Sequence, residues 1–338
     1  MQRRHFIIKN AALLSAAALS TSATTKRKPK KIKPNRLKEG DSVAFISPGS
    51  FLDDEGLQKA VQNVEGMGCK VMLSKNIRAH RGFLAGSDQQ RLDDLHWAFS
   101  DKQVKAIWCA RGGYGCSRLL HNLDYGMIKK NPKILIGYSD VTALLNAVSQ
   151  QTGLVTFHGP VAASDFTDYT KKHLQAVLFD GKEKHTISLP PTSENHVEPF
   201  SLYPKKVKGK LVGGNLSLLA AMAGTPYAVD FQGKIAFIED IGEKPYRIDR
   251  MLTQLRQACN LEKSCAVALG DFTDCDAEAP ESLTLKETLI DRLDFKNVPV
   301  GFRFPFGHTS DQCTLPIGTE VELELERMEI CLIESAVV

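Results

Sequence analysis

Three residues of the types found in acyl-transfer triads each close an apolar run in this sequence. Ser139, Glu239 and His308 stand in that chain order, and each run is predicted to be a strand. A serine, a carboxylate and an imidazole at strand ends can form one acyl-transfer site if they converge. No spacing rule links the three positions, so each taken alone is also compatible with a capping, solvated or structural role.

A strand, a turn and a helix place Ser139. The apolar run 134–136 predicts a buried parallel strand, and the i, i+3, i+4, i+7 apolar spacing of 141–148 predicts a helix packed on a sheet. Ser139 then stands before a helix N-terminus, where unpaired backbone N–H groups can stabilise an oxyanion. The arrangement is similar to a nucleophile elbow, although the G-x-S-x-G pattern is missing. The alternative is that Ser139 or Asp140 only caps the helix.

A second turn rich in glycine, residues 111–115, follows the strand predicted at 106–110. It fails the dinucleotide pattern G-x-G-x-x-G, because Arg118 stands where the third glycine should be. Glycine lets a backbone N–H approach a reacting carbonyl closely, so the turn fits an oxyanion donor better than a phosphate cradle. An ordinary tight turn is the alternative.

Strand, turn and helix recur through the first half of the chain. The strands predicted there begin at 41, 70, 106 and 134, and helices are predicted at 53–67, 88–99 and 141–148. Repeated βα units of this length imply a parallel sheet with helices on both faces, and ligands then bind at the carboxyl edges of the strands. We therefore expect an α/β fold, with an N-terminal flavodoxin-like domain and a smaller C-terminal α/β domain.

The pattern changes after residue 160. Prolines punctuate residues 161–205, which we interpret as the inter-domain linker between a nucleophile domain at 39–160 and a C-terminal domain at 206–335. In the C-terminal part, strands are predicted around 207–214, 235–240, 266–272 and 298–304, with helices at 216–223 and 248–258. Residues 320–326 alternate strictly and predict a half-exposed strand.

The net charge of +4 is concentrated at the N-terminus. Residues 1–38 hold 11 Lys and Arg and no acid, so the rest of the chain has 32 basic against 39 acidic residues. A body with a net charge of −7 argues against nucleic acid as the main ligand.

Residues 1–25 resemble a twin-arginine export signal, with Arg3 and Arg4 before a short apolar segment that cannot span a bilayer. We expect a periplasmic or exported protein without stable membrane insertion, and a cytoplasmic one if the signal is not used. Residues 26–38 then form a solvated basic linker.

Eight cysteines are scattered along the chain, at 69, 109, 116, 259, 265, 275, 313 and 331. A chain of this length does not need disulfides, so we expect mostly buried thiols. Neither C-x-x-C nor H-E-x-x-H occurs, and the sequence gives no argument for a metal or any other cofactor.

With these features the chain resembles the LD-carboxypeptidases, serine peptidases that also include the microcin C self-immunity hydrolases. The resemblance covers roughly residues 37–330. It is carried by seven motifs in the expected order: Gly40-Asp41 with Ser47-Pro48, Arg111-Gly112-Gly113-Tyr114-Gly115, Gly137-Tyr138-Ser139-Asp140, His158-Gly159-Pro160, Gly213-Gly214-Asn215-Leu216, Glu239-Asp240-Ile241-Gly242-Glu243 with Tyr246-Arg247-Ile248-Asp249-Arg250, and Gly307-His308.

The resemblance implies a triad of Ser139, Glu239 and His308. Ser139 would attack the carbonyl of an amide that joins an L-centre to a D-residue, and His308 would take the proton and return it to the leaving amine. Glu239 would fix the imidazole tautomer and stabilise its cationic form.

The same resemblance implies the groups around the reacting carbonyl. The backbone N–H groups of Asp140 and of Gly113, or its neighbour Gly112, would hold the oxyanion. The substrate ends in a carboxylate, for which Arg111 and the turn at Asn215 are the candidate binding groups.

The substrate implied is the tetrapeptide stem of peptidoglycan, from which terminal D-Ala is removed. Peptidoglycan-derived peptides are thus the expected partners, and a homodimer is compatible with the sequence. Two alternatives remain: an immunity-type hydrolase of peptidyl or aminoacyl nucleotides, and a non-catalytic peptidoglycan-binding protein. The export signal departs from many family members, which recycle muropeptides in the cytosol.

Overall fold

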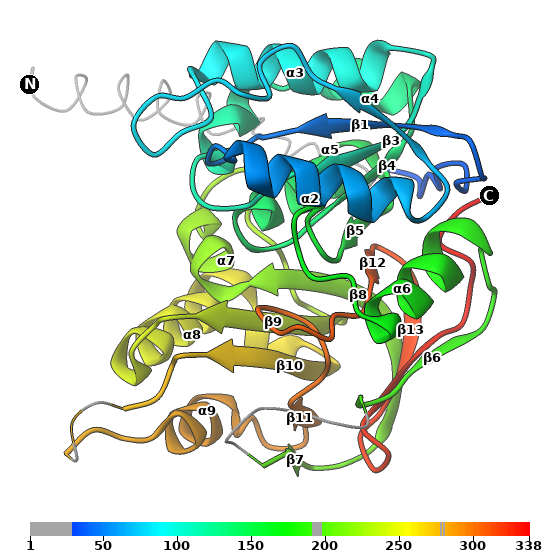
Figure 1. Ribbon diagram of the computed structural model, residues 1–338. Helices are drawn as coiled ribbons and strands as arrows, with labels where there is room; N and C mark the ends of the chain where they lie inside the picture. The colour runs from blue at the N-terminus through cyan, green and yellow to red at the C-terminus, as the bar shows by residue number, and fades with distance from the viewer. Residues whose placement is uncertain (1–28, 191–197, 278, 280) are drawn as a thin grey trace, which may run out of the picture.

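The computed structural model describes residues 29–190, 198–277, 279 and 281–338. Within these residues the chain forms a six-stranded sheet and an eight-stranded sheet, each with its own helices (Figure 1). The predicted export signal, residues 1–25, lies outside the described part of the chain. The mixed α/β architecture with a parallel sheet confirms the expected fold class.

Five parallel strands make up most of the first sheet: β1 (Ser42–Ile46), β2 (Lys70–Leu73), β3 (Val104–Cys109), β4 (Ile134–Gly137) and β5 (Thr156–His158). Their spatial order, 2-1-3-4-5, is that of flavodoxin-like folds. Strands β4 and β5 are buried along their whole length, as expected for a sheet covered on both faces. The carboxyl ends of these strands lie at one edge, where ligands bind in such sheets.

The first sheet carries the helices α2 (Asp54–Glu65), α3 (Asp88–Ser100), α4 (Tyr125–Lys130) and α5 (Thr142–Thr152). The α3 start follows from a capping box, because Ser87 accepts from the N–H of Gln90 and the Gln90 side chain accepts from the N–H of Ser87. Helix α5 is almost entirely buried, and it lies between the two sheets, where it contacts both β4 and the second sheet.

The second sheet has a parallel centre with antiparallel margins. Its centre is β8 (Lys206–Asn215), β9 (Ile235–Ile241), β10 (Ala266–Thr273) and β11 (Val300–Phe302). Its margins are β13 (Glu320–Glu324), β14 (Glu329–Leu332), β6 (His185–Ile187) and β7 (Phe200–Leu202). The helices are α7 (Leu216–Met222), α8 (Pro245–Cys259) and α9 (Leu285–Leu293). The strict alternation of exposure in β13 confirms the half-exposed strand predicted for this stretch.

The two halves of the chain exchange elements. Strand β12 (Leu315–Ile317), late in the sequence, pairs antiparallel with β5 at the edge of the first sheet. The stretch 161–205, interpreted above as a linker, holds α6 (Asp168–Leu174), a π-helical turn at Gln175–Phe179, and the strands β6 and β7 at the two edges of the second sheet (Figure 1). The described parts of this stretch, 161–190 and 198–205, therefore contain helical segments and strands, and both sheets contain strands from distant parts of the sequence.

Residues 29–38 differ from the expected solvated linker. Both Lys31 and Lys33 form ion pairs with Glu334, and the backbone N–H of Ile32 donates to Gly153 O at 2.8 Å. Leu37 is only 1% exposed. A basic run indicates solvation only when no acidic partner is near, and here the partner comes from the opposite end of the chain.

Among the described residues, no helix has the length and apolar character needed to cross a bilayer. All eight cysteines are free thiols; six are buried and two are partly buried, as expected. Burial raises the pKa of Cys69 to about 11 and raises the pKa of Cys275 to about 12, so these thiols are poor nucleophiles at neutral pH.

Candidate active site

Ser139 occupies the strained turn between β4 and α5. Its φ of +60° lies in the left-handed region, which residues other than glycine rarely adopt. Gly137 makes room for the turn, because a Cβ there would come within 2.9 Å of the Val141 side chain. The serine is half-buried at the carboxyl edge of the sheet. Strain of this kind at a strand-to-helix turn is a feature of nucleophile elbows.

The capping alternative is excluded for this turn. The N-cap residue of α5 is Val141, and no side chain forms a capping hydrogen bond there. Asp140 instead turns toward the glycine-rich segment, where its buried Oδ2 accepts from the N–H of Cys116 at 2.8 Å. Burial raises the pKa of Asp140. Neither Ser139 nor Asp140 is therefore explained by helix capping.

Glu239 and His308 are brought together from β9 and from the loop that follows β11. Their side chains are bonded at 2.8 Å between Glu239 Oε2 and His308 Nδ1. Glu239 is completely buried, whereas the His308 side chain is 15% exposed. Gly307, with φ +109°, allows this approach, because a Cβ there would lie 2.9 Å from the Glu239 Cβ.

The electrostatic setting of His308 favours its charged form. Burial alone lowers the pKa of His308, but the hydrogen bond to Glu239 and the negative charges of Glu239 and Asp240 outweigh it and raise the pKa. A carboxylate can only accept a hydrogen bond, so Nδ1 carries the proton and Nε2 of the neutral ring is left as the base.

The serine turn and the histidine loop meet across the two sheets. The ring of Tyr138, the residue before Ser139, lies 4.9 Å from the imidazole of His308, centroid to centroid. Next to this contact, α5 is bonded directly to β8. Thr142 Oγ1 accepts from the N–H of Asn215 at 3.0 Å, and the Asn146 amide donates to Gly213 O at 2.9 Å. These bonds fix the second sheet against the helix that follows Ser139.

The glycine-rich turn packs directly on the serine. A Cβ at Gly112 would lie 3.1 Å from Ser139 Cβ and 3.4 Å from its Oγ. Gly113, with φ +86°, faces Ser50, whose Oγ would lie 2.3 Å from a Cβ at Gly113. The N–H of Ser50 in turn donates to Gly112 O at 3.0 Å. A side chain at Gly113 would clash with Ser50, and one at Gly112 would crowd Ser139, so it is the backbone of Gly112 that lies against the serine.

The two candidate groups for a substrate carboxylate are placed differently. Arg111 is exposed, and its Nη1 donates to Phe51 O at 3.0 Å. Asn215 is 3% exposed, and its side chain caps α7 by accepting from the N–H of Leu218 while donating to Asp240 at 2.9 Å. The structure thus gives Asn215 a structural task and leaves the guanidinium of Arg111 at the surface.

The two halves of the chain each match a known family. Residues 43–159 match the LD-carboxypeptidase N-terminal domain, and residues 208–323 match the LD-carboxypeptidase C-terminal domain. The chain is also 40% identical over 293 residues to a probable murein peptide carboxypeptidase of Bacillus subtilis, which covers 85% of this chain and 90% of that protein. The chain belongs to the LD-carboxypeptidase family. As a member of this family the protein is a hydrolase.

Two further proteins are similar to this chain over most of its length. The murein tetrapeptide carboxypeptidase of Pseudomonas aeruginosa is 34% identical over 296 residues, which is 85% of this chain and 94% of that one. The solved structure of MccF in complex with glutamyl sulfamoyl guanosine superposes with a TM-score of 0.84 at 25% identity, and covers 90% of this chain and 99% of the other. The resemblance to the family stated from sequence is confirmed.

Sequence reasoning missed how Asp240 and Arg91 take part in the site's framework. Asp240 is buried beside Glu239 and holds the start of α7 through Ser217 and Asn215. Burial, and then the charge of Glu239, raise the pKa of Asp240 to about 6. The position of Asp240 next to Glu239 at a strand end could have indicated its role. Nothing in the sequence around Arg91, a polar stretch of α3, could have indicated the role of Arg91.

His158 is the other histidine of the site region. It is 1% exposed, burial lowers its pKa to about 4, and its ring packs on Phe237 at 5.1 Å. A neutral imidazole enclosed by aromatic rings is a packing group, which agrees with a structural role. Among the described residues, no group of three His, Cys, Asp or Glu side chains could hold a metal ion.

Proposed function

We propose that the protein is a serine-type LD-carboxypeptidase that releases terminal D-Ala from peptidoglycan tetrapeptides. The observation that carries this proposal is the 2.8 Å bond between Glu239 and His308, formed where the strained Ser139 turn meets the histidine loop. A serine with positive φ, an imidazole and a buried carboxylate are the parts that a triad needs. The murein carboxypeptidase relatives support the substrate class.

In the proposed reaction, Ser139 Oγ attacks the carbonyl carbon of the L-D amide while its proton passes to Nε2 of His308. The tetrahedral intermediate collapses when the C–N bond breaks, and His308 returns the proton to the amine of D-Ala. Water then attacks the acyl-enzyme with the same imidazole as base, which releases the tripeptide acid and restores Ser139. Glu239 holds the tautomer and stabilises the imidazolium.

The oxyanion of both tetrahedral intermediates would lie between Ser139 and the glycine-rich turn. We assign its donors to the backbone N–H of Asp140 and to that of Gly113 or Gly112. The close packing of Gly112 on Ser139 supports this assignment. Removing one such donor typically costs about 10²–10³ in kcat.

For the terminal carboxylate of D-Ala, Arg111 is the stronger of the two candidates. Its guanidinium is exposed and precedes Gly112 in the chain, so it can bind a carboxylate with paired N–H groups. Asn215 is the weaker candidate, because its side chain is already used to cap α7 and to donate to Asp240.

We further propose that the protein acts outside the cytoplasm, through the twin-arginine-like segment at 1–25. Its substrate would then be stem peptides of the wall itself or muropeptides released into the envelope.

A second candidate function is favoured by one observation, the TM-score of 0.84 with MccF in complex with a glutamyl sulfamoyl nucleoside. An immunity-type hydrolase would cut an amide of an aminoacyl or peptidyl nucleotide with the same nucleophile.

Mass spectrometry of the products separates these functions. The purified protein is incubated with disaccharide tetrapeptide, with a tetrapeptide ending in L-Ala, and with an aminoacyl sulfamoyl nucleoside. The proposal predicts loss of one alanine from the D-Ala substrate alone. Cleavage of the nucleoside alone would favour the immunity function. Tetrapeptide binding without turnover and without reaction with a serine-directed acylating probe would indicate a non-catalytic binding protein.

A further inference from the structure

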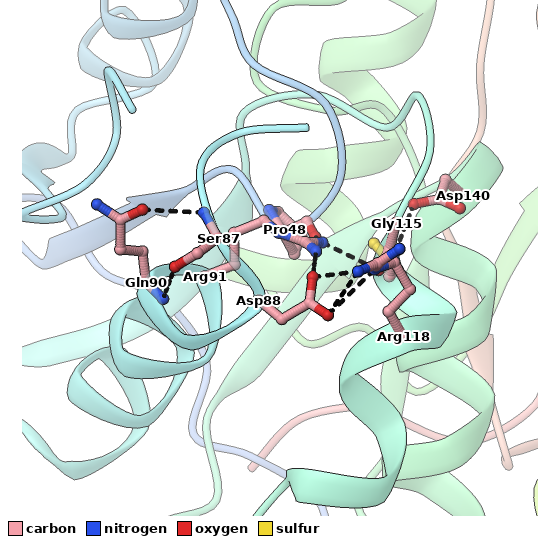
Figure 2. Close-up of polar contacts among 9 residues, drawn as sticks. Pro48, Ser87, Asp88, Gln90, Arg91, Gly115, Arg118 and Asp140 are labelled. Atoms are coloured by element: carbon pink, nitrogen blue, oxygen red, sulfur yellow. Dashed lines mark hydrogen bonds and ion pairs between the residues drawn. The ribbon is translucent and has the colours of Figure 1, made fainter. Parts of the chain in front are cut away.

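A buried guanidinium is bonded to two neighbouring turns, one of which, residues 111–115, packs on Ser139. Arg91, in the first turns of α3, is 1% exposed, although arginine is rarely buried without a specific task. Figure 2 shows its side chain between Pro48, Gly115 and Asp88. Its Nη1 donates both to Pro48 O and, at 2.9 Å, to Gly115 O. One guanidinium therefore bonds the backbone of both turns.

The second of these turns packs on Ser139 through Gly112, and the first turn packs on the second. The first, residues 48–50, is bonded to the second by the N–H of Ser50 on Gly112 O, at 3.0 Å, and by the N–H of Tyr114 on Ser50 Oγ, at 3.1 Å. A Cβ at Gly49 would lie 2.4 Å from Gly112 O and 2.8 Å from Asp140 Oδ2. A shift of either turn would move the backbone beside Ser139.

The second turn cannot hold its own position. It contains three glycines within residues 111–115, and two of them, Gly113 and Gly115, have φ of +86° and +128°. Glycine loses more conformational freedom on folding than any other residue, so such a turn needs external bonds to keep one conformation. Arg91 supplies such a bond at Gly115, and Asp140 supplies another at the N–H of Cys116.

The charge of Arg91 is balanced by Asp88, which is itself partly exposed. Its Nη2 donates to Asp88 Oδ1, and Asp88 also accepts from Arg118 at 2.9 Å to both of its oxygens (Figure 2). Asp88 and Arg118 are 41% and 44% exposed. The hydrogen bond from Arg118 is the main reason why the pKa of Asp88 is lowered, and the carboxylate stays ionised at neutral pH.

We propose that Arg91 is a positioning residue for the oxyanion site: by bonding the Pro48 and Gly115 carbonyls it sets the place of the Gly112 and Gly113 N–H groups relative to Ser139 Oγ. Arg91 does not touch substrate. The forked guanidinium is needed because it reaches two carbonyls and a carboxylate at once, which a lysine ammonium on a flexible stem cannot reproduce. This inference rests on the proposed serine mechanism and adds a residue to it.

The test measures reaction of Ser139 with a fluorophosphonate probe, whose phosphonyl oxygen takes the place of the oxyanion. Arg91→Lys should lower the labelling rate by about 10- to 100-fold, less than the roughly 10²–10³ caused by losing one oxyanion donor outright, because the donors are displaced rather than removed. With tetrapeptide, kcat should fall by a similar factor while KM stays within about threefold, because the loss acts on the transition state. Labelling of Arg91→Lys at the wild-type rate would overturn the inference.

Because a buried arginine can be needed for folding, a matched pair on the exposed side gives a second test. Asp88→Ala and Arg118→Ala both break the exposed Asp88–Arg118 pair, but only Asp88→Ala removes the partner of Arg91. Asp88→Ala should slow labelling by about three- to tenfold, with Arg118→Ala within twofold of wild type. The role of Arg91 would be contradicted if wild type, Asp88→Ala and Arg118→Ala were labelled at the same rate. It would also be contradicted if the two variants lost the same fraction of the labelling rate.

The same probe separates this inference from the function on which it rests. If wild-type protein is not labelled at Ser139, the serine mechanism itself is wrong. If wild-type protein is labelled at Ser139, and both Arg91→Lys and Asp88→Ala are labelled at the wild-type rate, the serine mechanism is supported and the positioning role of Arg91 is wrong.

Discussion

Glu239 and His308, 69 residues apart in the chain, share a 2.8 Å hydrogen bond in which a fully buried carboxylate accepts from the Nδ1–H of a nearly buried imidazole. Burial of an unpaired carboxylate is costly, so this bond stabilises Glu239 as well as orienting His308. The second carboxylate oxygen of Glu239 has no partner among the described residues. The pair is therefore held by one bond, and its chemistry is open to direct tests.

Replacing the carboxylate by an amide tests the orienting role. In Glu239→Gln the amide can donate to Nδ1 and favour the wrong tautomer, so kcat should fall by about 10³- to 10⁴-fold with little change in KM. D-Ala release, followed by mass spectrometry, measures the loss. Glu322→Gln, on the exposed side of β13, is the matched control and should keep wild-type activity.

The pH profile tests the electrostatics of His308. Its pKa is raised because the bond to Glu239 and the nearby carboxylates outweigh burial, which alone would lower it. The neutral ring is the base, so kcat/KM should rise with pH through a midpoint above the ordinary histidine value of about 6.5. In Glu239→Gln the midpoint should move to lower pH. An unchanged midpoint would show that Glu239 does not set the pKa of this ring.

The packed N-terminal segment makes a prediction about stability. Burial would raise the pKa of Glu334, but hydrogen bonds from Lys31 and from the Glu320 N–H, with Lys33, lower it to about 2. A lowered carboxylate pKa stabilises the fold above the unfolded value and loses that effect as pH falls toward the folded value. Glu334→Gln should lower the free energy of unfolding by about 1–3 kcal/mol at pH 7.

Denaturant melts across pH check the origin of this effect. The difference between wild type and Glu334→Gln should shrink as pH falls below about 4.5, the usual range of a glutamate. Glu329→Gln, on β14, serves as the control. A difference that does not change with pH would mean that the contribution of Glu334 is not electrostatic.

Export can be tested apart from catalysis. Replacing both Arg3 and Arg4 by lysine should abolish twin-arginine-dependent export, because that route reads the arginine pair. Cell fractionation of the full-length chain, with a lysine change at Arg36 as control, measures the result. If the variant with lysine at positions 3 and 4 reached the periplasm in the same amount as the Arg36→Lys control, the twin-arginine signal would be excluded.

Much of the fold could be predicted because buried parallel strands have a clear sequence pattern. Buried runs such as 134–136 are apolar throughout, and the strand-turn-helix repeat fixes the edge at which their ends lie. For this reason the sequence alone indicated Ser139 and Glu239 as candidate site residues. The bond between Glu239 and His308, and the position of the Tyr138 ring beside that imidazole, could not be derived from spacing, because they depend on how the two sheets pack across α5 and β8.

Other features depend on contacts between residues far apart in the sequence. Strand β12 pairs with β5 at Leu315 and His158, which are 157 residues apart. The local sequence pattern of neither strand predicts this pairing. The ion pairs of Lys31 and Lys33 need Glu334, so a basic run read alone suggested solvation. Arg91 was missed for the same reason, because its partners are backbone carbonyls of distant turns.

The most direct test of the central proposal is D-Ala release by Ser139→Ala compared with Ser149→Ala, a serine on α5 that lies outside the proposed triad. With disaccharide tetrapeptide as substrate, we predict that Ser139→Ala loses up to about 10⁶ in kcat, while Ser149→Ala keeps the wild-type rate. Release of D-Ala by a folded Ser139→Ala protein at the wild-type rate would contradict the account.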